Sequence, residues 1–215
     1  NKVNMELFIK RHKELWRRTD FIISVLSGFL FLIGSLVINY FAGIYATERA
    51  SNTVTDIILD NLPTVNTEFI FVQGIFIFLL FVVWLLIKEP KQIPFVLKTI
   101  ALFVIVRSIF ITLTHLGPPA DNSFANYTGI IKKFTFGGDL FFSGHTGLSF
   151  LMALIFWEKK YYRNIFIAIS ILFGAAVLLG HLHYSIDVFA AFFITDGIFR
   201  IAKRLFIKDR QLFLS

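Results

Sequence analysis

An all-α integral membrane protein is the fold class that this sequence predicts, and three observations lead to it. The chain is 56% hydrophobic and only 16% charged, with 28 Phe residues and a mean hydropathy of +0.73. Globular domains are usually roughly 45–50% apolar and about 25% charged. Apolar runs of about 20 residues, each able to cross roughly 30 Å of hydrocarbon, recur along the chain. They are continuous rather than alternating, which favours helices over a barrel.

Six apolar segments are predicted to be transmembrane helices. In chain order they are Phe21–Ala46, Phe69–Ile87, Phe95–Thr114, Leu140–Trp157, Ile165–Gly180 and Tyr184–Ile201. The fifth is the shortest. We therefore divide the chain into a basic N-terminal segment (1–20), a six-helix domain (21–205) and a cytoplasmic tail (206–215).

The N-terminal segment has apolar residues at near-helical spacing, among them Phe8, Ile9 and Trp16, with basic residues between them. Such a pattern is typical of an amphipathic helix on the inner membrane surface. A solvated basic tail that only enforces topology is the alternative.

Basic residues predict how the chain crosses the membrane. Most of the 21 Lys and Arg residues lie in the N-terminal segment, the second and fourth connections and the tail. By the positive-inside rule both termini are cytoplasmic, and the first, third and fifth connections lie on the exoplasmic or periplasmic side. Because this orientation explains the net charge of +7, no nucleic-acid partner is expected. The absence of cysteine excludes disulfides and thiolate metal sites.

Two histidines and one aspartate stand at the outward ends of apolar segments, where ionisable residues are costly and usually functional. His183 precedes Asp187 by four residues, so one helix face can hold both. A carboxylate on one ring nitrogen fixes the tautomer and makes the other more nucleophilic. His145 lies at the outer end of the fourth segment. The three residues therefore predict an outward-facing site for phosphoryl transfer through histidine.

Two alternatives remain open for this constellation. His183 and Asp187 could be a helix-capping pair with no chemistry. A metal site could recruit His181, His115 or Asp139, although no metal-binding motif is complete.

The sequence around His145 predicts an anion site. A small-residue turn entering a helix presents free backbone N–H groups, and Ser143, Gly144 and Thr146 surround the histidine. His145 could protonate a leaving alkoxide there. The alternative is that Ser143 only caps the helix and His145 is an interfacial side chain.

Arg107 lies inside the third segment, where a guanidinium needs a partner or a wet cavity. A phosphate suits its planar fork. The alternatives are that Arg107 extends its side chain to the membrane surface or pairs structurally with Asp139 or Asp187. Asp139 itself could position a substrate hydroxyl or cap a helix.

These residues resemble the type 2 phosphatidic acid phosphatase superfamily and, within it, the sphingomyelin synthase-like branch. Residues Gly138–Thr146 are similar to that branch's G-D-x-x-x-S-G-H-T motif, and His181–Asp187 to its H-x-H-Y-[ST]-x-D motif. Supporting similarities are an acidic, proline-bearing stretch at Thr55–Pro63, the pair Arg107-Ser108, and the proline loop Gly117–Pro119.

The resemblance implies a six-helix enzyme that uses neither a metal nor another cofactor. It makes His183 the nucleophile that takes the phospho-head group, Asp187 the residue that orients it, and His145 the acid and then the base. Its substrates would be a phospholipid donor and a lipid alcohol. The residues expected to bind phosphate or substrate are Arg107, Asp139, Ser143, Gly144, Thr146 and Tyr184.

One departure from the broader superfamily favours head-group transfer over monoester hydrolysis. The arginine expected six residues before the second histidine is Val177 here. Phosphate binding then depends on Arg107 and the Ser143–Thr146 turn, with Lys133 as a further candidate. Hydrolysis by water stays open as an alternative reaction, and a non-enzymatic scaffold or transporter as an alternative class.

Overall fold

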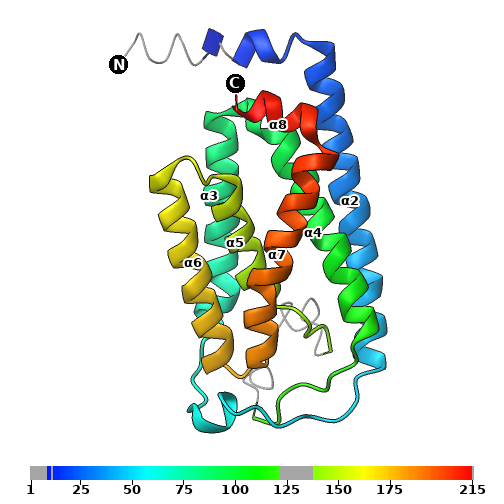
Figure 1. Cartoon of the computed structure of the whole chain (residues 1–215), viewed down its shortest axis with the longest axis vertical. Helices are drawn as coiled ribbons and strands as arrows, with labels where there is room; N and C mark the ends of the chain where they lie inside the picture. Colours follow the sequence, from blue (N-terminus) through cyan, green and yellow to red (C-terminus); the bar gives the residue numbers. More distant parts are fainter. Residues whose placement is uncertain (1–8, 11, 122–137, 215) are drawn as a thin grey trace.

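The structure, a computed structural model, describes residues 9–10, 12–121 and 138–214. All the regular elements in these residues are helices, and the six helices α2 to α7 stand side by side in one bundle (Figure 1). Lys133, named above as a candidate for phosphate binding, lies outside the described residues, as do parts of the predicted N-terminal segment.

Each of the six predicted segments coincides for most of its length with one helix. These are α2 (Thr19–Glu48), α3 (Gly74–Lys88), α4 (Ile93–Leu113), α5 (Gly144–Ile155), α6 (Lys160–Leu179) and α7 (Ser185–Leu205). Shorter elements are η1 (Leu59–Asn61), the π-helical turn η2 (Phe69–Gln73) that leads into α3, η3 (Pro90–Gln92) and α8 (Ile207–Leu214). The tail predicted at 206–215 is therefore largely helical.

Four helices are long and apolar enough to cross a membrane, which is consistent with an integral membrane protein. They span Thr19–Glu48, Phe69–Lys88, Pro90–Leu113 and Lys160–Leu179. The prediction of six spans is thus confirmed for four segments only. The segments that contain α5 and α7 do not meet the same measure, each for a different reason.

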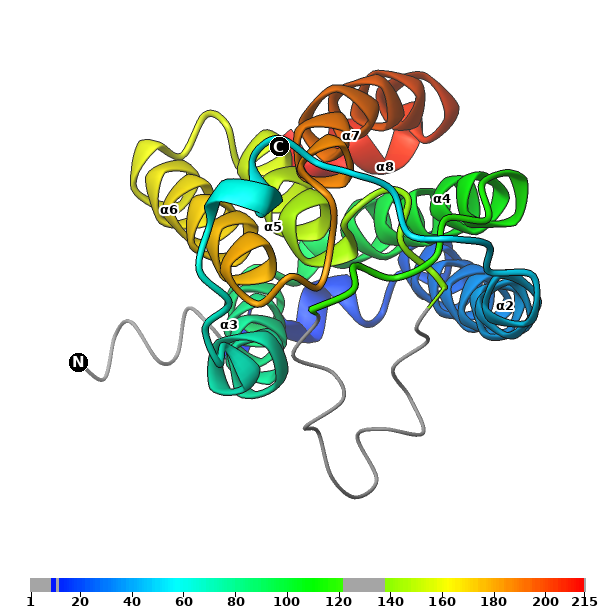
Figure 2. The same ribbon diagram turned by 90° about the horizontal axis from the view of Figure 1, so that it is seen from below.

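The α5 helix has only 12 residues, which gives about 18 Å at 1.5 Å per residue. It lies in the middle of the bundle, with α3, α4, α6 and α7 around it (Figure 2). Leu151, Met152 and Ala153 are fully buried. Because protein surrounds α5, its apolar character reflects the core of the bundle rather than contact with lipid.

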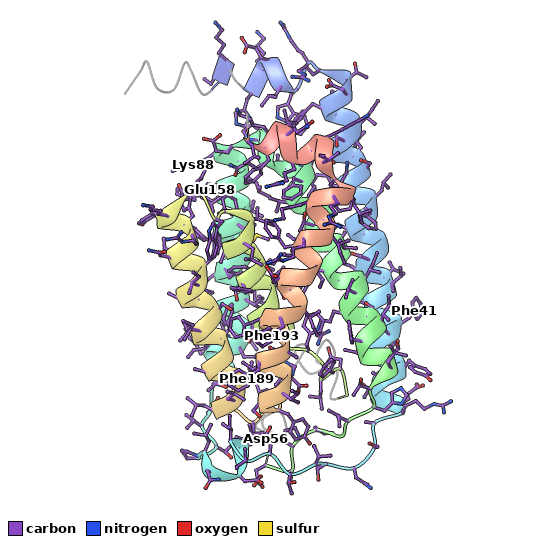
Figure 3. All side chains as sticks on the ribbon, viewed as in Figure 1. Phe41, Asp56, Lys88, Glu158, Phe189 and Phe193 are labelled. Carbon is purple, nitrogen blue, oxygen red and sulfur yellow. The ribbon has the colours of Figure 1, made fainter. Side chains whose placement is uncertain are left out.

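The α7 helix is long enough, with 21 residues, but its last turns are charged. Asp196 and Arg200 form an ion pair there. Its outer face is nevertheless apolar: Phe189 and Phe193 project from the outside of the bundle, as Phe41 does from α2 (Figure 3). Phe193 is 80% exposed, as expected for a side chain that faces lipid.

The chain termini and the connections that hold the histidine motifs lie at opposite ends of the bundle. Both termini lie at one end, where α8 crosses the bundle (Figure 1). The connections 49–68 and 180–184 and the described residues 114–121 and 138–143 gather at the other end. There Gly117 N donates to Asn52 O at 3.2 Å, and Val65 N donates to Leu179 O at 2.7 Å. Histidine motifs that are distant in the sequence therefore meet at the end away from the termini.

Candidate active site

His183 and Asp187 lie where the last connection enters α7. His183 Nδ1 is 3.4 Å from Asp187 Oδ2, and both side chains are buried. The same Oδ2 accepts a hydrogen bond of 2.9 Å from the backbone N–H of Tyr184. His183 Nδ1 makes no hydrogen bond to any described residue. The predicted pair is therefore in contact, and Asp187 also caps its helix, so the first alternative describes part of its role.

The His145 turn is attached directly to this pair. Ser143 caps α5: its Oγ accepts a hydrogen bond of 3.5 Å from the backbone N–H of Thr146 and a second, of 3.2 Å, from Thr146 Oγ1. The backbone N–H of Ser143 donates to the carbonyl of Asp187 at 3.1 Å. This single bond joins the start of α5 to the start of α7, and it holds the two histidine motifs in fixed register.

His145 is oriented by aromatic rings and by one carbonyl. Its ring stacks on Phe71 with centroids 4.1 Å apart and meets the Phe173 ring edge-on at 5.5 Å. Nε2 lies 3.0 Å from the carbonyl oxygen of Phe71, inside the π-helical turn. A carbonyl only accepts, so Nε2 carries the proton, and Nδ1 is the nitrogen left for proton transfer.

No sequence signal points to Phe71. Its role depends on the π-helical turn, a feature that is frequent at functional sites but has no simple sequence pattern. His183 and Arg107 both act electrostatically on His145. The structure therefore brings together the three residues that the sequence singled out.

Arg107 reaches the same region from α4, and its partners are protein groups. Nε donates to the carbonyl of Phe142 at 3.0 Å, and Nη2 donates to the carbonyl of Asp139 at 2.6 Å. The Asp139 carboxylate lies 3.2 Å from Nη2. The pairing considered as an alternative is thus present, and it clamps the segment that leads into the His145 turn.

Gly144 allows this close approach of arginine and turn. A Cβ atom at Gly144 would lie 3.3 Å from Arg107 Nε, closer than most real contacts. The guanidinium is therefore packed against the first turn of α5, next to its backbone N–H groups. Burial raises the pKa of the Asp139 carboxyl, while Arg107 and His183 oppose this effect.

Tyr184 is buried, and its hydroxyl bonds to two backbone groups. Its hydroxyl donates to Gly117 O at 2.8 Å and accepts from Val54 N at 3.2 Å. The phenol thus links the first and third connections to the start of α7.

Asp56 also binds the start of α7, through a charged hydrogen-bond acceptor. Oδ2 accepts a hydrogen bond of 2.6 Å from Ser185 N, and Oδ1 accepts from Ile58 N at 2.9 Å and from Leu59 N at 3.2 Å. Burial opposes ionisation, yet these backbone donors together hold the pKa of Asp56 below its usual range. The sequence showed this residue only as part of an acidic stretch.

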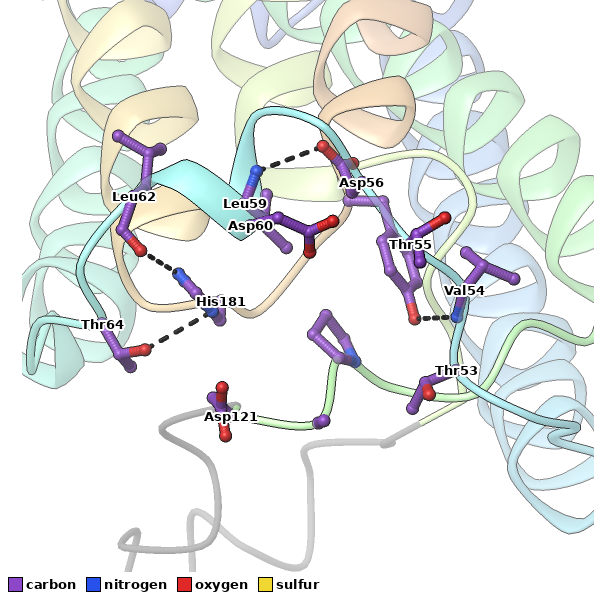
Figure 4. A pocket seen from close by; sticks show the side chains of 13 residues that line it. Thr53, Val54, Thr55, Asp56, Leu59, Asp60, Leu62, Thr64, Asp121 and His181 are labelled. Atoms are coloured by element: carbon purple, nitrogen blue, oxygen red, sulfur yellow. Dashed lines mark hydrogen bonds between the residues drawn. The ribbon is translucent and has the colours of Figure 1, made fainter.

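A cavity of about 350 Å³ lies beside the histidine motif, among the connections (Figure 4). Asp60 and Asp121 line it, together with His181 and Tyr184. His181 Nε2 lies 3.2 Å from the carbonyl of Leu62 and Nδ1 lies 3.4 Å from Thr64 Oγ1.

Of the three residues considered for a metal site, Asp139 lies near enough to His183 to interact with it electrostatically, whereas His181 and His115 contact other residues. His181 is engaged with the first connection, and His115 stacks edge-on with Tyr45 at 5.5 Å. Within the described part of the chain, no three His, Asp or Glu side chains come close enough together to hold a metal ion.

Comparison with known proteins finds one family model that matches part of the chain. Residues 137–204 match the family model described as PAP2 superfamily C-terminal, a stretch that runs from the approach to the His145 turn through most of α7. The resemblance to the type 2 phosphatidic acid phosphatase superfamily is thereby confirmed. No curated protein and no solved structure matches the chain.

Proposed function

We propose that this member of the type 2 phosphatidic acid phosphatase superfamily is an integral membrane lipid phosphotransferase. It moves a phospho-head group from a phospholipid to a lipid alcohol, such as ceramide or diacylglycerol, through a phosphohistidine intermediate. One observation carries the proposal: His183 and Asp187 are buried in contact at 3.4 Å, beside the turn that holds His145.

In the first step, Nε2 of His183 attacks the phosphorus of the donor. A P–N bond forms, the P–O bond to the glyceride oxygen breaks, and the protonated His145 donates its Nδ1 proton to that oxygen. Diacylglycerol leaves as a neutral alcohol. Asp187 beside Nδ1 stabilises the positive charge that the His183 ring acquires.

In the second step, the acceptor reverses these roles. Neutral His145 takes the proton of the acceptor hydroxyl, whose oxygen attacks phosphorus as the P–N bond breaks. His183 returns to its neutral form and His145 to its protonated form. The head group has then moved from one lipid oxygen to another with no net change in the enzyme.

Two features support binding of the phosphate oxygens. The first turn of α5 presents backbone N–H groups of Gly144 and His145 at a helix N-terminus, which favours anions. Arg107 lies against this turn and adds a fixed positive charge. A phosphate that enters would compete with Asp139 for the guanidinium. The guanidinium can donate two parallel hydrogen bonds to phosphate oxygens, so its geometry suits a phosphate.

The substitution at Val177 supports transfer rather than monoester hydrolysis. Val177 is buried at 1% exposure in an apolar cluster with Phe71, Leu182 and Val188. This position therefore contributes packing and no second cation for a dianionic phosphate. Water as the acceptor would give the alternative hydrolase, which shares the first step.

We infer that the site faces away from the cytoplasm. The positive-inside rule assigns both termini to the cytoplasm, and both termini lie at the end of the bundle opposite the histidines (Figure 1). The polar cavity beside His181 gives a lipid head group room at this outer end.

The test is turnover of fluorescent ceramide in a mixed phospholipid pool, beside His183→Ala. A new ceramide phospho-head-group lipid, lost in the variant, supports the transferase, and its mass identifies the donor. Diacylglycerol without a new ceramide lipid, again lost in the variant, would replace the transferase by the hydrolase. Equal product with and without His183 would contradict the proposal and favour a scaffold that retains an old site.

A further inference from the structure

A second hollow lies at the other end of the bundle, where the chain termini are. It has a volume of about 350 Å³ and is enclosed by residues of α5, α7 and α8 and by the connection after α5. Its apolar lining includes Phe199, Phe213 and Leu214, and its basic lining consists of Arg200, Lys203 and Arg210. Its lining on α7 lies in the second half of that helix, between Asp196 and Lys203, whereas the histidine site lies at the start of the helix.

A buried polar cluster holds α8 in position over this hollow. Asp209 accepts hydrogen bonds from Ser24 Oγ and from Lys98 Nζ, the latter at 2.7 Å. Lys98 Nζ also donates to Ser24 Oγ at 2.8 Å. Because the cluster joins α2, α4 and α8, the next residue, Arg210, has a fixed place at the hollow.

The charges of the hollow are only partly balanced. Arg200 pairs with Asp196 at 2.6 Å, and Lys203 lies over the Phe199 ring, 4.8 Å from its centroid. Among the described residues, neither Lys203 nor Arg210 forms an ion pair with a carboxylate. Glu158, the other acid of the lining, is exposed on the connection between α5 and α6 (Figure 3).

The surroundings fit the boundary between lipid and water. The α8 helix lies across the end of the bundle (Figure 1), and it exposes apolar side chains, with Leu214 at 59% and Ile207 at 54%. A helix of this kind is suited to the head-group layer of a bilayer. Two half-buried cations beside apolar rings thus lie next to a helix that is suited to the head-group layer.

We propose that this hollow binds an anionic phospholipid of the adjacent leaflet, separately from the catalytic site. Lys203 and Arg210 bind the phosphate, and the acyl chain packs along Phe199 and Leu214. The occupant is a lipid rather than a free phosphate because one wall of the hollow is apolar. An anionic rather than a zwitterionic lipid fits because the lining carries more basic than acidic groups.

The experiment measures lipid binding to the full chain in mild detergent by native mass spectrometry. Phosphatidylglycerol, phosphatidylcholine and inorganic phosphate are titrated against the natural protein, the double variant Lys203→Gln/Arg210→Gln, and the control Lys159→Gln/Lys160→Gln. Both variants lose two positive charges at the same end of the bundle, and Lys159 and Lys160 are exposed outside the lining. Glutamine keeps most of each side chain's apolar stem.

Each basic side chain at an anionic lipid surface strengthens binding by about fivefold. The Lys203/Arg210 variant is therefore expected to bind phosphatidylglycerol roughly 25-fold more weakly, while the control variant changes less than about twofold. Equal melting temperatures of both variants without lipid show that α8 stays in place. If the Lys203/Arg210 variant melts at a lower temperature, the salt dependence of lipid binding by the natural protein is measured instead. Added salt must then weaken its binding of phosphatidylglycerol and leave its binding of phosphatidylcholine unchanged.

Three results would overturn the proposal. Equal binding of phosphatidylcholine and phosphatidylglycerol by the natural protein would remove the selectivity for anionic lipid. Equal loss in both double variants would show a general charge effect rather than a site. Binding of inorganic phosphate as tight as that of the lipid would show that the apolar wall contributes nothing.

Discussion

Asp56→Asn is the substitution that tests most sharply how the start of α7 is held. Asparagine keeps the size of the side chain but offers only one acceptor oxygen, and it removes the negative charge. That oxygen is expected to stay with Ile58 and Leu59, which supply two donors. The N–H of Ser185, now 2.6 Å from Asp56 Oδ2, then loses its acceptor.

A hydrogen bond to a charged group stabilises by about 1.5–3 kcal/mol. Loss of about 2 kcal/mol at this point corresponds to roughly 30-fold more frequent local opening. We expect the amide of Ser185 to exchange with deuterium faster by that factor, and head-group transfer to fall because His183 lies two residues away. Asp60→Asn is the matched control for the exchange measurement, since Asp60 is an exposed aspartate in the same connection.

The same bond predicts a pH dependence with a definite sign. Because the folded-state pKa of Asp56 lies below the ordinary value of 3.8, its stabilisation is complete above that value and is lost as the pH falls through the folded pKa. Exchange at Ser185 should therefore differ between the natural protein and Asp56→Asn at neutral pH, and the difference should close only in strong acid. Unchanged exchange at neutral pH would refute the assigned role.

Three further predictions concern the site, the packing and the orientation. Arg107→Lys removes the planar fork, and transfer should fall by about tenfold or more in the lipid product assay, whereas unchanged turnover would exclude a phosphate role. Gly147→Ala places a Cβ atom 2.8 Å from a buried phenylalanine ring and should destabilise the folded protein by about 1–3 kcal/mol. The control is Gly34→Ala, where nothing lies within 4 Å of the added Cβ. Equal melting temperatures of the two variants would contradict this prediction. Because the chain has no cysteine, Asn61→Cys should react with an impermeant maleimide on intact cells and Gln211→Cys only after permeabilisation, and the reverse order would invert the proposed topology.

Hydropathy was sufficient to predict where the helices lie, but not what surrounds each of them. A run of apolar residues indicates burial from water and does not distinguish lipid from protein. The α5 helix illustrates this: it reads as a membrane span, yet its 12 residues are enclosed by other helices. The α7 helix is the opposite case: its charged last turns lower its mean hydropathy, yet Phe193 lies exposed on the outside of the bundle.

The contact of His183 with Asp187 was predictable because the two residues are close in sequence at the start of one helix, although His183 precedes the first helical residue, Ser185. Contacts that depend on the path of a connection were not predictable in this way. Tyr184 came from the motif as a binding residue, and the structure gives its hydroxyl to Gly117 and Val54. The carbonyl of Phe71 at His145 depends on a π-helical turn, for which the sequence has no simple signature.

The central claim is that His183 carries the phospho-head group between two lipids, and direct detection of that adduct tests it. The protein is mixed with a donor phospholipid without acceptor, quenched within the first turnover, and its intact mass and peptides are measured at neutral pH. The account predicts a head-group phosphate on His183, lost on addition of ceramide and never formed by His183→Ala. An adduct on another residue, or turnover by His183→Ala at the natural rate, would contradict it.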